Sequence, residues 1–349
     1  MPTFAPRALA TGIGSMPHMD PRAALRVVFD NVPDVPFWPQ LPCRDFRENM
    51  YVQYSQELPT VQIDEPHEWI GAVTGEDTLA QVESFYARYL ADDPNLFAVG
   101  EEYAAGLYAL QAEPGWLRQA KWVKGQVTGP ISMGLKITDQ NLRPILYDDT
   151  LRDVLVKHIA RMAQWHERFL SELGTCLTFV DEPSLALIGA SVVALNGDEV
   201  IRDLEEVYAS LKGLKGTHCC GNTDWSLLLQ TSVDVISFDA YSYAENLALF
   251  ADDVRRFLDR GGALAWGIVP TVEEHLARET TEHLVERLDA AAGLLIKKGI
   301  DRDLLYERAL ITPACGLGPL SVTGAEQALA LTRRVSERVR EREGLVTDP

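Results

Sequence analysis

The sequence predicts an α/β protein and, within that class, a (β/α)8 TIM barrel with an extended insertion after strand 2. Two observations lead to this prediction: short apolar runs alternate with longer amphipathic segments, and eight such runs occur in 349 residues. Strands that alternate with helices form a parallel sheet, and eight units fit the usual length of a closed barrel. A doubly wound open sheet is the alternative fold. We expect residues 1–349 to form one barrel domain.

The eight candidate strands are short, apolar and bounded by turn residues. They are residues 8–15, 35–42, 121–130, 176–183, 214–220, 233–240, 263–270 and 308–318. Apolar residues spaced three and four apart predict amphipathic helices over 150–174 and 271–299, and Gly299 is placed to end the second. Four histidines are expected on solvated helix faces outside the barrel: His158, His166, His275 and His283.

Residues 43–120 are too long for a single connection, so we expect an excursion on the barrel, in part helical, that could cover its mouth. This stretch contains an Asp-Glu-Pro sequence within 63–69, which we assign to a turn.

The composition excludes several classes of protein. The net charge is −19, which argues against nucleic acid and anionic membranes because both need clustered Lys and Arg. No apolar stretch approaches the roughly 18 residues that span a bilayer, and the first residues do not form a signal-peptide pattern. Five cysteines, two of them adjacent, make a disulfide framework improbable and predict a cytoplasmic protein.

Nearly every candidate strand ends in a polar or ionisable residue. These residues are Ser15, Gln40, Thr128, Asp181, Glu182, His218, Cys220, Asp239 and Cys315. Because the carboxyl ends of barrel strands surround one site, we expect these side chains to face a common cavity.

The last of these strand ends indicate a metal site. His218 and Cys220 are two residues apart, so both point to the same side of a strand, while Cys219 points away. Asp239 ends the next strand and Cys315 ends the last one. An imidazole with two thiolates favours Zn²⁺ over magnesium or calcium.

Two other interpretations of these cysteines stay open. A buried Cys pair beside a hydrogen-bonded His would explain the short motif without a metal. A redox pair is less well supported, because adjacent cysteines lack the spacing of a thioredoxin-type motif. Cys43 and Cys176 are expected to be small buried residues.

The predicted ligand set also predicts a chemistry. Zinc with two thiolates and a carboxylate has a formal net charge of about −1, which makes it a poor electrophile for hydrolysis. Such a centre can still bind a substrate thiol as a thiolate that remains nucleophilic at neutral pH. We therefore expect a substrate sulfur to attack an electrophilic carbon.

The motifs of this sequence resemble those of a known family. "THCC", "DVISFDA" and "TPACGLG" are similar to the three zinc segments of cobalamin-independent methionine synthases. "TGIGSMP", "VKGQVTGP" and "FVDEP" resemble further segments of its catalytic, C-terminal barrel, in the same order. The sequence thus resembles a core form of that barrel, within the superfamily that also contains uroporphyrinogen decarboxylase.

The resemblance implies a zinc-dependent methyltransferase that converts homocysteine to methionine. It implies that His218, Cys220 and Cys315 are catalytic zinc ligands, with Asp239 where the family has Glu. The substrate-binding residues it implies are Gly14, Ser15, Glu48 and Asp181. Gly14 and Ser15 would hold the carboxylate, and Asp181 the ammonium. The implied donor is methylcobalamin, a corrinoid protein or methyltetrahydrofolate; segments that hold a folate tail are not evident, nor is the family's additional N-terminal barrel.

Three alternatives to this function stay open. The first is a zinc methyltransferase for another thiol, such as coenzyme M, although coenzyme M has no ammonium group for Asp181. The second is a decarboxylase of the uroporphyrinogen type, which needs no metal. The third is a zinc or thiol-binding protein without turnover.

Overall fold

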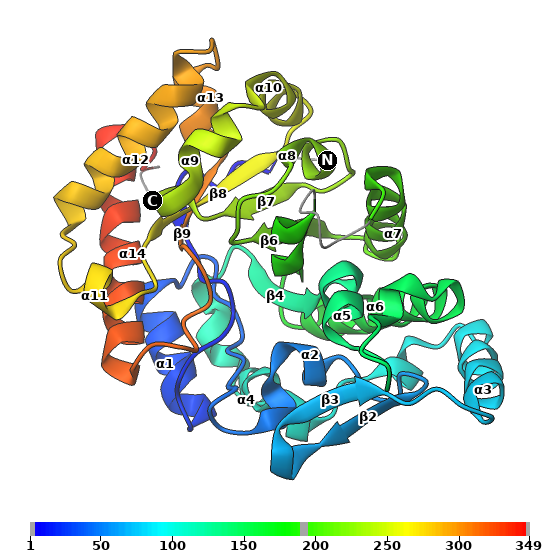
Figure 1. Ribbon diagram of the computed structural model, residues 1–349. Coiled ribbons are helices and arrows are strands. Elements are labelled where there is room, and N and C mark those ends of the chain that lie inside the picture. Colours follow the sequence, from blue (N-terminus) through cyan, green and yellow to red (C-terminus); the bar gives the residue numbers. More distant parts are fainter. Residues whose placement is uncertain (1–3, 189–194, 347–349) are drawn as a thin grey trace.

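A curled parallel sheet forms the centre of the computed structural model, which describes residues 4–188 and 195–346 (Figure 1). Its seven strands lie in the order β1-β9-β8-β7-β6-β5-β4, and every neighbouring pair is parallel. They are β1 (Leu9–Ala10), β4 (Val123–Thr128), β5 (Cys176–Asp181), β6 (Leu214–Cys219), β7 (Val235–Phe238), β8 (Ala263–Val269) and β9 (Ala309–Pro313). The predicted α/β class is confirmed.

The segment predicted as the second strand, 35–42, is extended but forms only isolated bridges. Ser15 pairs with Gln40 on one side and Phe37 pairs with Lys124 of β4 on the other. Pro36 and Pro39 interrupt this segment, and proline has no N–H to donate to a ladder. In the described ranges the central sheet therefore has seven regular strands where eight were predicted.

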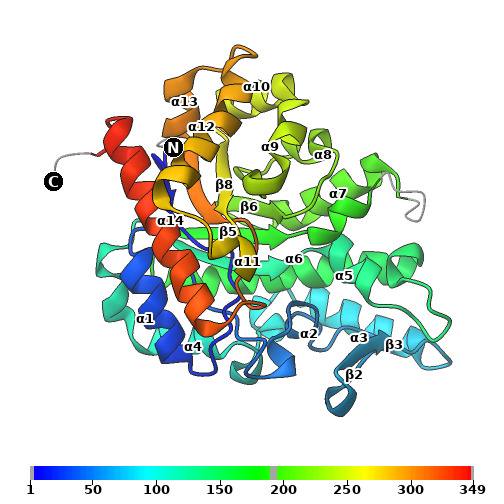
Figure 2. The same cartoon turned by 60° about the vertical axis from the view of Figure 1, so that its left-hand side comes forward.

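Helices cover the outer face of the sheet, as Figure 2 shows from a second side. They are α1 (Pro21–Asn31), α5 (Pro130–Lys136), α6 (Asp149–Ser171), α7 (Gly197–Ala209), α8 (Trp225–Leu229), α9 (Ala240–Ala248), α10 (Ala251–Asp259), α11 (Glu273–Leu276), α12 (Thr281–Ile296), α13 (Arg302–Glu307) and α14 (Val322–Arg342). The predicted helix 150–174 is α6, which begins at Asp149 because Asp148 caps it by accepting from the Thr150 and Leu151 N–H groups.

The predicted helix 271–299 is divided in two, and this prediction was wrong in its continuity. α11 ends at Leu276 and α12 begins at Thr281. Thr280 starts the second helix, since its hydroxyl accepts a hydrogen bond from the His283 N–H at 3.2 Å. Gly299 follows the end of α12 with a φ of +85°, a conformation that favours glycine and that confirms it as the stop residue.

Two of the four helix histidines predicted to be solvated are instead fully buried on α6. The His166 Nε2 accepts a hydrogen bond of 2.8 Å from the Trp38 indole, and the His158 Nε2 lies 3.0 Å from the Tyr54 carbonyl. Burial lowers the pKa of His158 to about 4 and that of His166 to about 3, so both rings are neutral at physiological pH. The His166 ring packs against Trp38, and the His158 ring packs against aromatic side chains of the 43–120 region, while His275 and His283 are exposed as predicted.

Residues 43–120 form a mixed region at one side of the sheet (Figure 1). It contains α2 (Met50–Gln53), the hairpin β2 (Val61–Asp64) and β3 (Trp69–Ala72), α3 (Thr78–Leu90) and α4 (Ala105–Ala112). The Asp-Glu-Pro sequence makes the short turn of the hairpin, as predicted.

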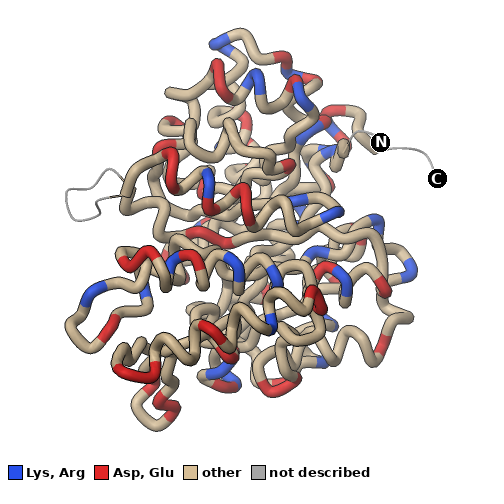
Figure 3. Tube along the Cα trace, turned by 90° about the vertical axis from the view of Figure 1, so that its right-hand side faces the viewer, with Lys and Arg blue, Asp and Glu red and all other residues tan. Residues whose placement is uncertain are grey.

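Acidic and basic residues are interspersed along the face drawn in Figure 3. None of the helices in the described parts of the chain is both long and apolar enough to cross a membrane.

Candidate metal centre and its pocket

Three soft donors converge where β6 and β9 end. One ligand atom each from His218, Cys220 and Cys315 lies within 4.8 Å of the others. Because His218 and Cys220 are two residues apart in an extended stretch, they share one side, and Cys219 is buried elsewhere with its Sγ 3.7 Å from the Gly221 carbonyl. The predicted convergence of strand ends 97 residues apart follows from the parallel sheet, which places both at the same edge.

The imidazole of His218 has the arrangement of a metal ligand. Its Nδ1 lies 2.9 Å from the Ser237 hydroxyl on the neighbouring strand β7, while its Nε2 is buried without a hydrogen-bond partner among the described residues. With the proton on Nδ1 and Ser237 as acceptor, Nε2 presents a lone pair to the cluster. A buried nitrogen without a partner is costly, and a metal ion would satisfy it.

The pKa values of the two thiols are shifted by their surroundings. The pKa of Cys220 is lowered because the Cys315 thiol donates to it and because His218 lies beside it. Burial and the same neighbouring sulfur raise the pKa of Cys315. The two sulfurs thus lie close enough for each to shift the pKa of the other, and a zinc ion would bind both as thiolates. One imidazole and two thiolates fit zinc by their chemistry.

Asp239 is not part of this group of donors. Its carboxylate caps α9 by accepting from the Ser242 N–H at 2.8 Å, and burial raises its pKa. The side chain is one methylene shorter than the Glu of the family pattern, and its oxygen is occupied by the cap. Zinc ligation by Asp239 therefore stays a prediction.

A cavity of about 380 Å³ opens above the three donors. Its walls include Ser15, Glu48 and Asp181 together with the three donors. Candidate residues from four different strand ends and Glu48 from the excursion thus line one pocket, whereas Gly14 and Asp239 are not among its lining residues.

The two carboxylates of this pocket differ in their hydrogen bonding. Asp181 has an Oδ1 that is buried with no partner among the described residues, and burial raises its pKa. Glu48 is saturated: its oxygens accept from the Leu41 N–H at 2.9 Å and from Arg44 at 2.7 Å, and burial raises its pKa to about 7. Asp181 is therefore the carboxylate available to a ligand cation.

Gly14 and Ser15 lie where the first strand meets the loop of the last one. The Ser15 hydroxyl accepts from the Gly318 N–H at 3.2 Å, and the Ser15 carbonyl accepts from the Leu317 N–H at 2.9 Å. A Cβ on Gly14 would lie 2.7 Å from the Gln126 side chain, so only glycine fits there without rearrangement.

Two features of the pocket were missed in the sequence. Cys43 was expected to be buried, but it is exposed in the loop after 35–42, lines the pocket and lies 3.7 Å from the Gly318 carbonyl. Lys124 is buried inside the sheet, and its alternation with Gln126 and Thr128 on one strand face could have revealed it.

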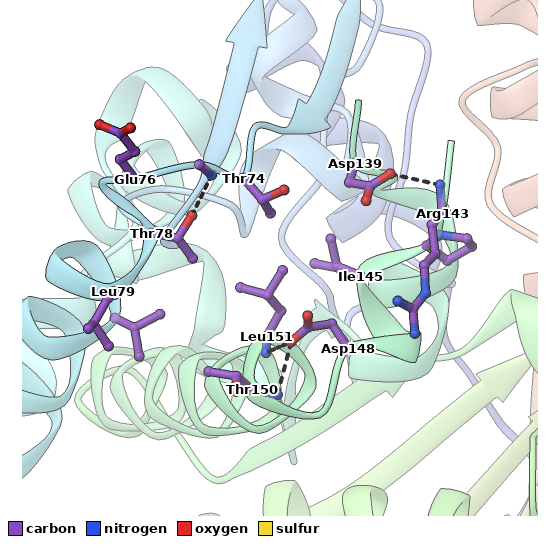
Figure 4. A pocket seen from close by; sticks show the side chains of 13 residues that line it. Thr74, Glu76, Thr78, Leu79, Asp139, Arg143, Ile145, Asp148, Thr150 and Leu151 are labelled. Carbon is purple, nitrogen blue, oxygen red and sulfur yellow. Dashed lines mark hydrogen bonds between the residues drawn. The ribbon is translucent and has the colours of Figure 1, made fainter. Parts of the chain in front are cut away.

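A second cavity, of about 420 Å³, lies far from these chemical groups in the fold (Figure 4). It is formed by the end of the hairpin, the start of α3 and the loop before α6, and includes Thr74, Arg143 and Asp148. None of the candidate site residues lines it.

Comparison with known proteins agrees with the resemblance seen in the motifs. No model of a known protein family matches the sequence. A curated protein named methionine synthase, from Methanothermobacter thermautotrophicus, is 26% identical over 204 residues. The chain resembles a methionine synthase. The matched stretch covers 58% of this chain and 58% of that relative.

A solved structure of a B12-independent methionine synthase from Shewanella sp. W3-18-1, in complex with selenomethionine, also matches. The likeness has a TM-score of 0.48 and 19% sequence identity and covers 68% of each chain.

Proposed function

We propose that this protein is a zinc-dependent methyltransferase that transfers a methyl group to the thiol of homocysteine and forms methionine. The observation that carries the proposal is the convergence of His218, Cys220 and Cys315 within 4.8 Å at one pocket. The similarity to a methionine synthase supports it. We propose the same three residues as zinc ligands, with Asp239 as a further candidate.

In this proposal the other end of the pocket binds the amino-acid part of homocysteine. Asp181 receives the ammonium, because its buried Oδ1 has no other partner among the described residues. Gly14 and Ser15 hold the carboxylate through backbone N–H groups and the Ser15 hydroxyl. Glu48 closes the wall beside them, held by Arg44. An amino acid fits this wall better than coenzyme M, which lacks an ammonium.

The chain's own residues act by positioning. Zinc, when bound, would hold the substrate thiol as a thiolate that is nucleophilic at neutral pH. Ser237 fixes the His218 ring, and Asp181 with Ser15 fixes the substrate backbone, so the sulfur has one orientation towards the opening. The sulfur forms its bond to the methyl carbon as the bond from that carbon to the donor breaks, and the electron pair leaves with the donor. Fixing both reactants supplies much of the acceleration.

We propose a methylated corrinoid, free or carried by a protein, or methyltetrahydrofolate as the donor. We also propose that segment 35–42 takes the place of the second strand and closes a single-domain (β/α)8 barrel. Its bridges to Ser15 and to Lys124 support this, because they join the two edges of the seven-stranded sheet.

The test is zinc stoichiometry on protein purified without chelator. We expect about one zinc per chain in the wild type and its loss in Cys220→Ser and Cys315→Ser, since each substitution removes a thiolate ligand. Cys43→Ser is the matched control, because Cys43 lies in the same pocket but outside the donor group, and it should keep its zinc.

Methyl transfer from methylcobalamin or methyltetrahydrofolate is then assayed with homocysteine and with coenzyme M. A wild type that takes up no zinc after reconstitution would overturn the proposal in favour of a metal-free decarboxylase. If the protein prefers coenzyme M, the proposed zinc site stands but the acceptor is another thiol. If it binds zinc but transfers no methyl group to either thiol, it is a binding protein without turnover.

A further inference from the structure

Lys124 is an ionisable group that the proposed function does not use. It lies on β4, it is only 1% exposed, and Lys is almost never fully buried without a partner. Its burial inside the sheet therefore needs an explanation.

The surroundings of Lys124 fix its ammonium in one place. Nζ donates to the Ile13 carbonyl, lies 3.4 Å from the Gln126 Oε1 and stands 4.4 Å from the centre of the Phe179 ring. The charged group that acts on it is Asp181, whose strand pairs directly with β4. The floor of the pocket, which Asp181 lines, thus has a buried lysine next to it.

The Ile13 carbonyl and the Gly14 N–H belong to the same peptide group. A cation that bonds the carbonyl polarises the peptide and makes its N–H a stronger donor. Among the residues that the structure describes, neither the Gly14 N–H nor the Ser15 N–H donates to another group. Two free donors therefore follow the Ile13 carbonyl that Lys124 binds, on a segment whose Ile13 and Ser15 line the pocket.

We propose that Lys124 is a positioning residue for the substrate carboxylate. It acts through the Ile13–Gly14 peptide, which it holds and polarises, and it places a positive charge behind the two N–H donors. With Asp181 beside it, the floor is complementary to a zwitterion, with the ammonium on Asp181 and the carboxylate on the Lys124 side. The inference rests on the proposed function and specifies its substrate class as an α-amino acid with a free carboxylate.

The test compares two thiols that differ only at the carboxylate. L-Homocysteine and 3-aminopropane-1-thiol share the sulfur and the ammonium, and their binding to zinc-loaded protein is measured by calorimetry without a methyl donor. We expect the wild type to prefer homocysteine, and Lys124→Met to reduce that preference by about tenfold, the value of one charge-assisted hydrogen bond.

The matched control is Lys136→Met, an exposed lysine near the end of α5 that should leave the preference unchanged. Lys124→Met should also keep its zinc, because Lys124 is no ligand. If Lys124→Met does not fold, Lys124→Gln, which keeps an N–H donor for Ile13 without the charge, replaces it and the same ratio decides.

The outcomes separate this inference from the proposed function. An unchanged preference in the variant, or an equal loss of affinity for both thiols, overturns the role of Lys124 and leaves homocysteine binding in place. A zinc-loaded wild type that binds neither thiol overturns the proposed function and this inference together.

Discussion

The two ends of the pocket are built in different ways. At the metal end, His218 lies on the regular strand β6, and a side chain of the next strand orients it. At the amino-acid end, Gly14, Ser15 and Glu48 lie on irregular segments that contact each other through backbone groups and buried polar side chains. His218 and Asp181 are thus positioned by strand geometry, whereas Gly14, Ser15 and Glu48 depend on individual hydrogen bonds. A substitution at one end of the pocket should therefore change ligand binding at that end and leave binding at the other end unchanged.

The largest difference between homocysteine binding and zinc binding is expected from Asp181→Asn. The substitution removes the charge that we propose receives the ammonium, and losing one partner of a buried ion pair costs on the order of 2–5 kcal/mol. Homocysteine binding, measured by calorimetry on zinc-loaded protein, should weaken by at least about thirtyfold, with zinc content unchanged.

Asp239→Asn is measured beside this variant, because Asp239 is the further candidate zinc ligand. If Asp239 is no ligand, that substitution changes neither zinc content nor homocysteine affinity. Loss of zinc in Asp181→Asn would contradict the separation of the two ends, and loss of zinc in Asp239→Asn would make Asp239 a ligand.

A smaller effect is expected at the metal end from Ser237→Ala. The alanine removes the hydroxyl 2.9 Å from the His218 Nδ1, so the ring loses the group that fixes its orientation. Removing such partners of ligating histidines lowers metal affinity by roughly 10–100-fold. Competition with a chelator measures the zinc affinity, and Ser226→Ala, a half-buried serine on α8 outside the pocket, serves as the control. Equal zinc affinity in wild type and Ser237→Ala would show that β7 does not support the site.

The last effect concerns stability and not ligand binding, and it is expected from Glu48→Gln at the amino-acid end as a change in the pH dependence of unfolding. Burial raises the pKa of Glu48 from 4.5 to about 7, so between these values the folded protein binds more protons than the unfolded chain. Stability therefore falls as pH rises through this window. Glu48→Gln should reduce the fall in unfolding free energy between pH 5 and pH 8 by up to about 3 kcal/mol, measured by urea denaturation. The same pH slope in both proteins would show that Glu48 does not titrate there.

The same contrast explains what the sequence could predict. His218, Cys220 and Cys315 were predicted together because alternation along a strand and the common edge of a parallel sheet place them with simple rules. Asp239 was predicted on the same rules, yet its short side chain is taken by the α9 cap, which depends on a local backbone turn that strand periodicity does not describe.

The parts that were missed depend on three-dimensional packing. The prolines of 35–42 leave only bridges where a strand was predicted, and His158 and His166 are buried because α6 turns that face inward. Cys43 is exposed at the pocket because the loop after Pro42 stays at the surface. The role of Lys124 could not be predicted from the sequence, because its hydrogen-bond partner, the Ile13 carbonyl, is brought next to it only by the fold.

The contact between Ser15 and Gly318 has a consequence for how the protein is made. β1 pairs with β9, and Ser15 bonds the loop that carries Cys315, so the site joins segments about 300 residues apart. During synthesis the early segments are available long before Cys315 leaves the ribosome, and His218 with Cys220 alone gives two donors, too few for a stable zinc site. On the proposed function, zinc capture is therefore a late event that reports a fully assembled sheet, and a chain interrupted before Cys315 would be left without its metal.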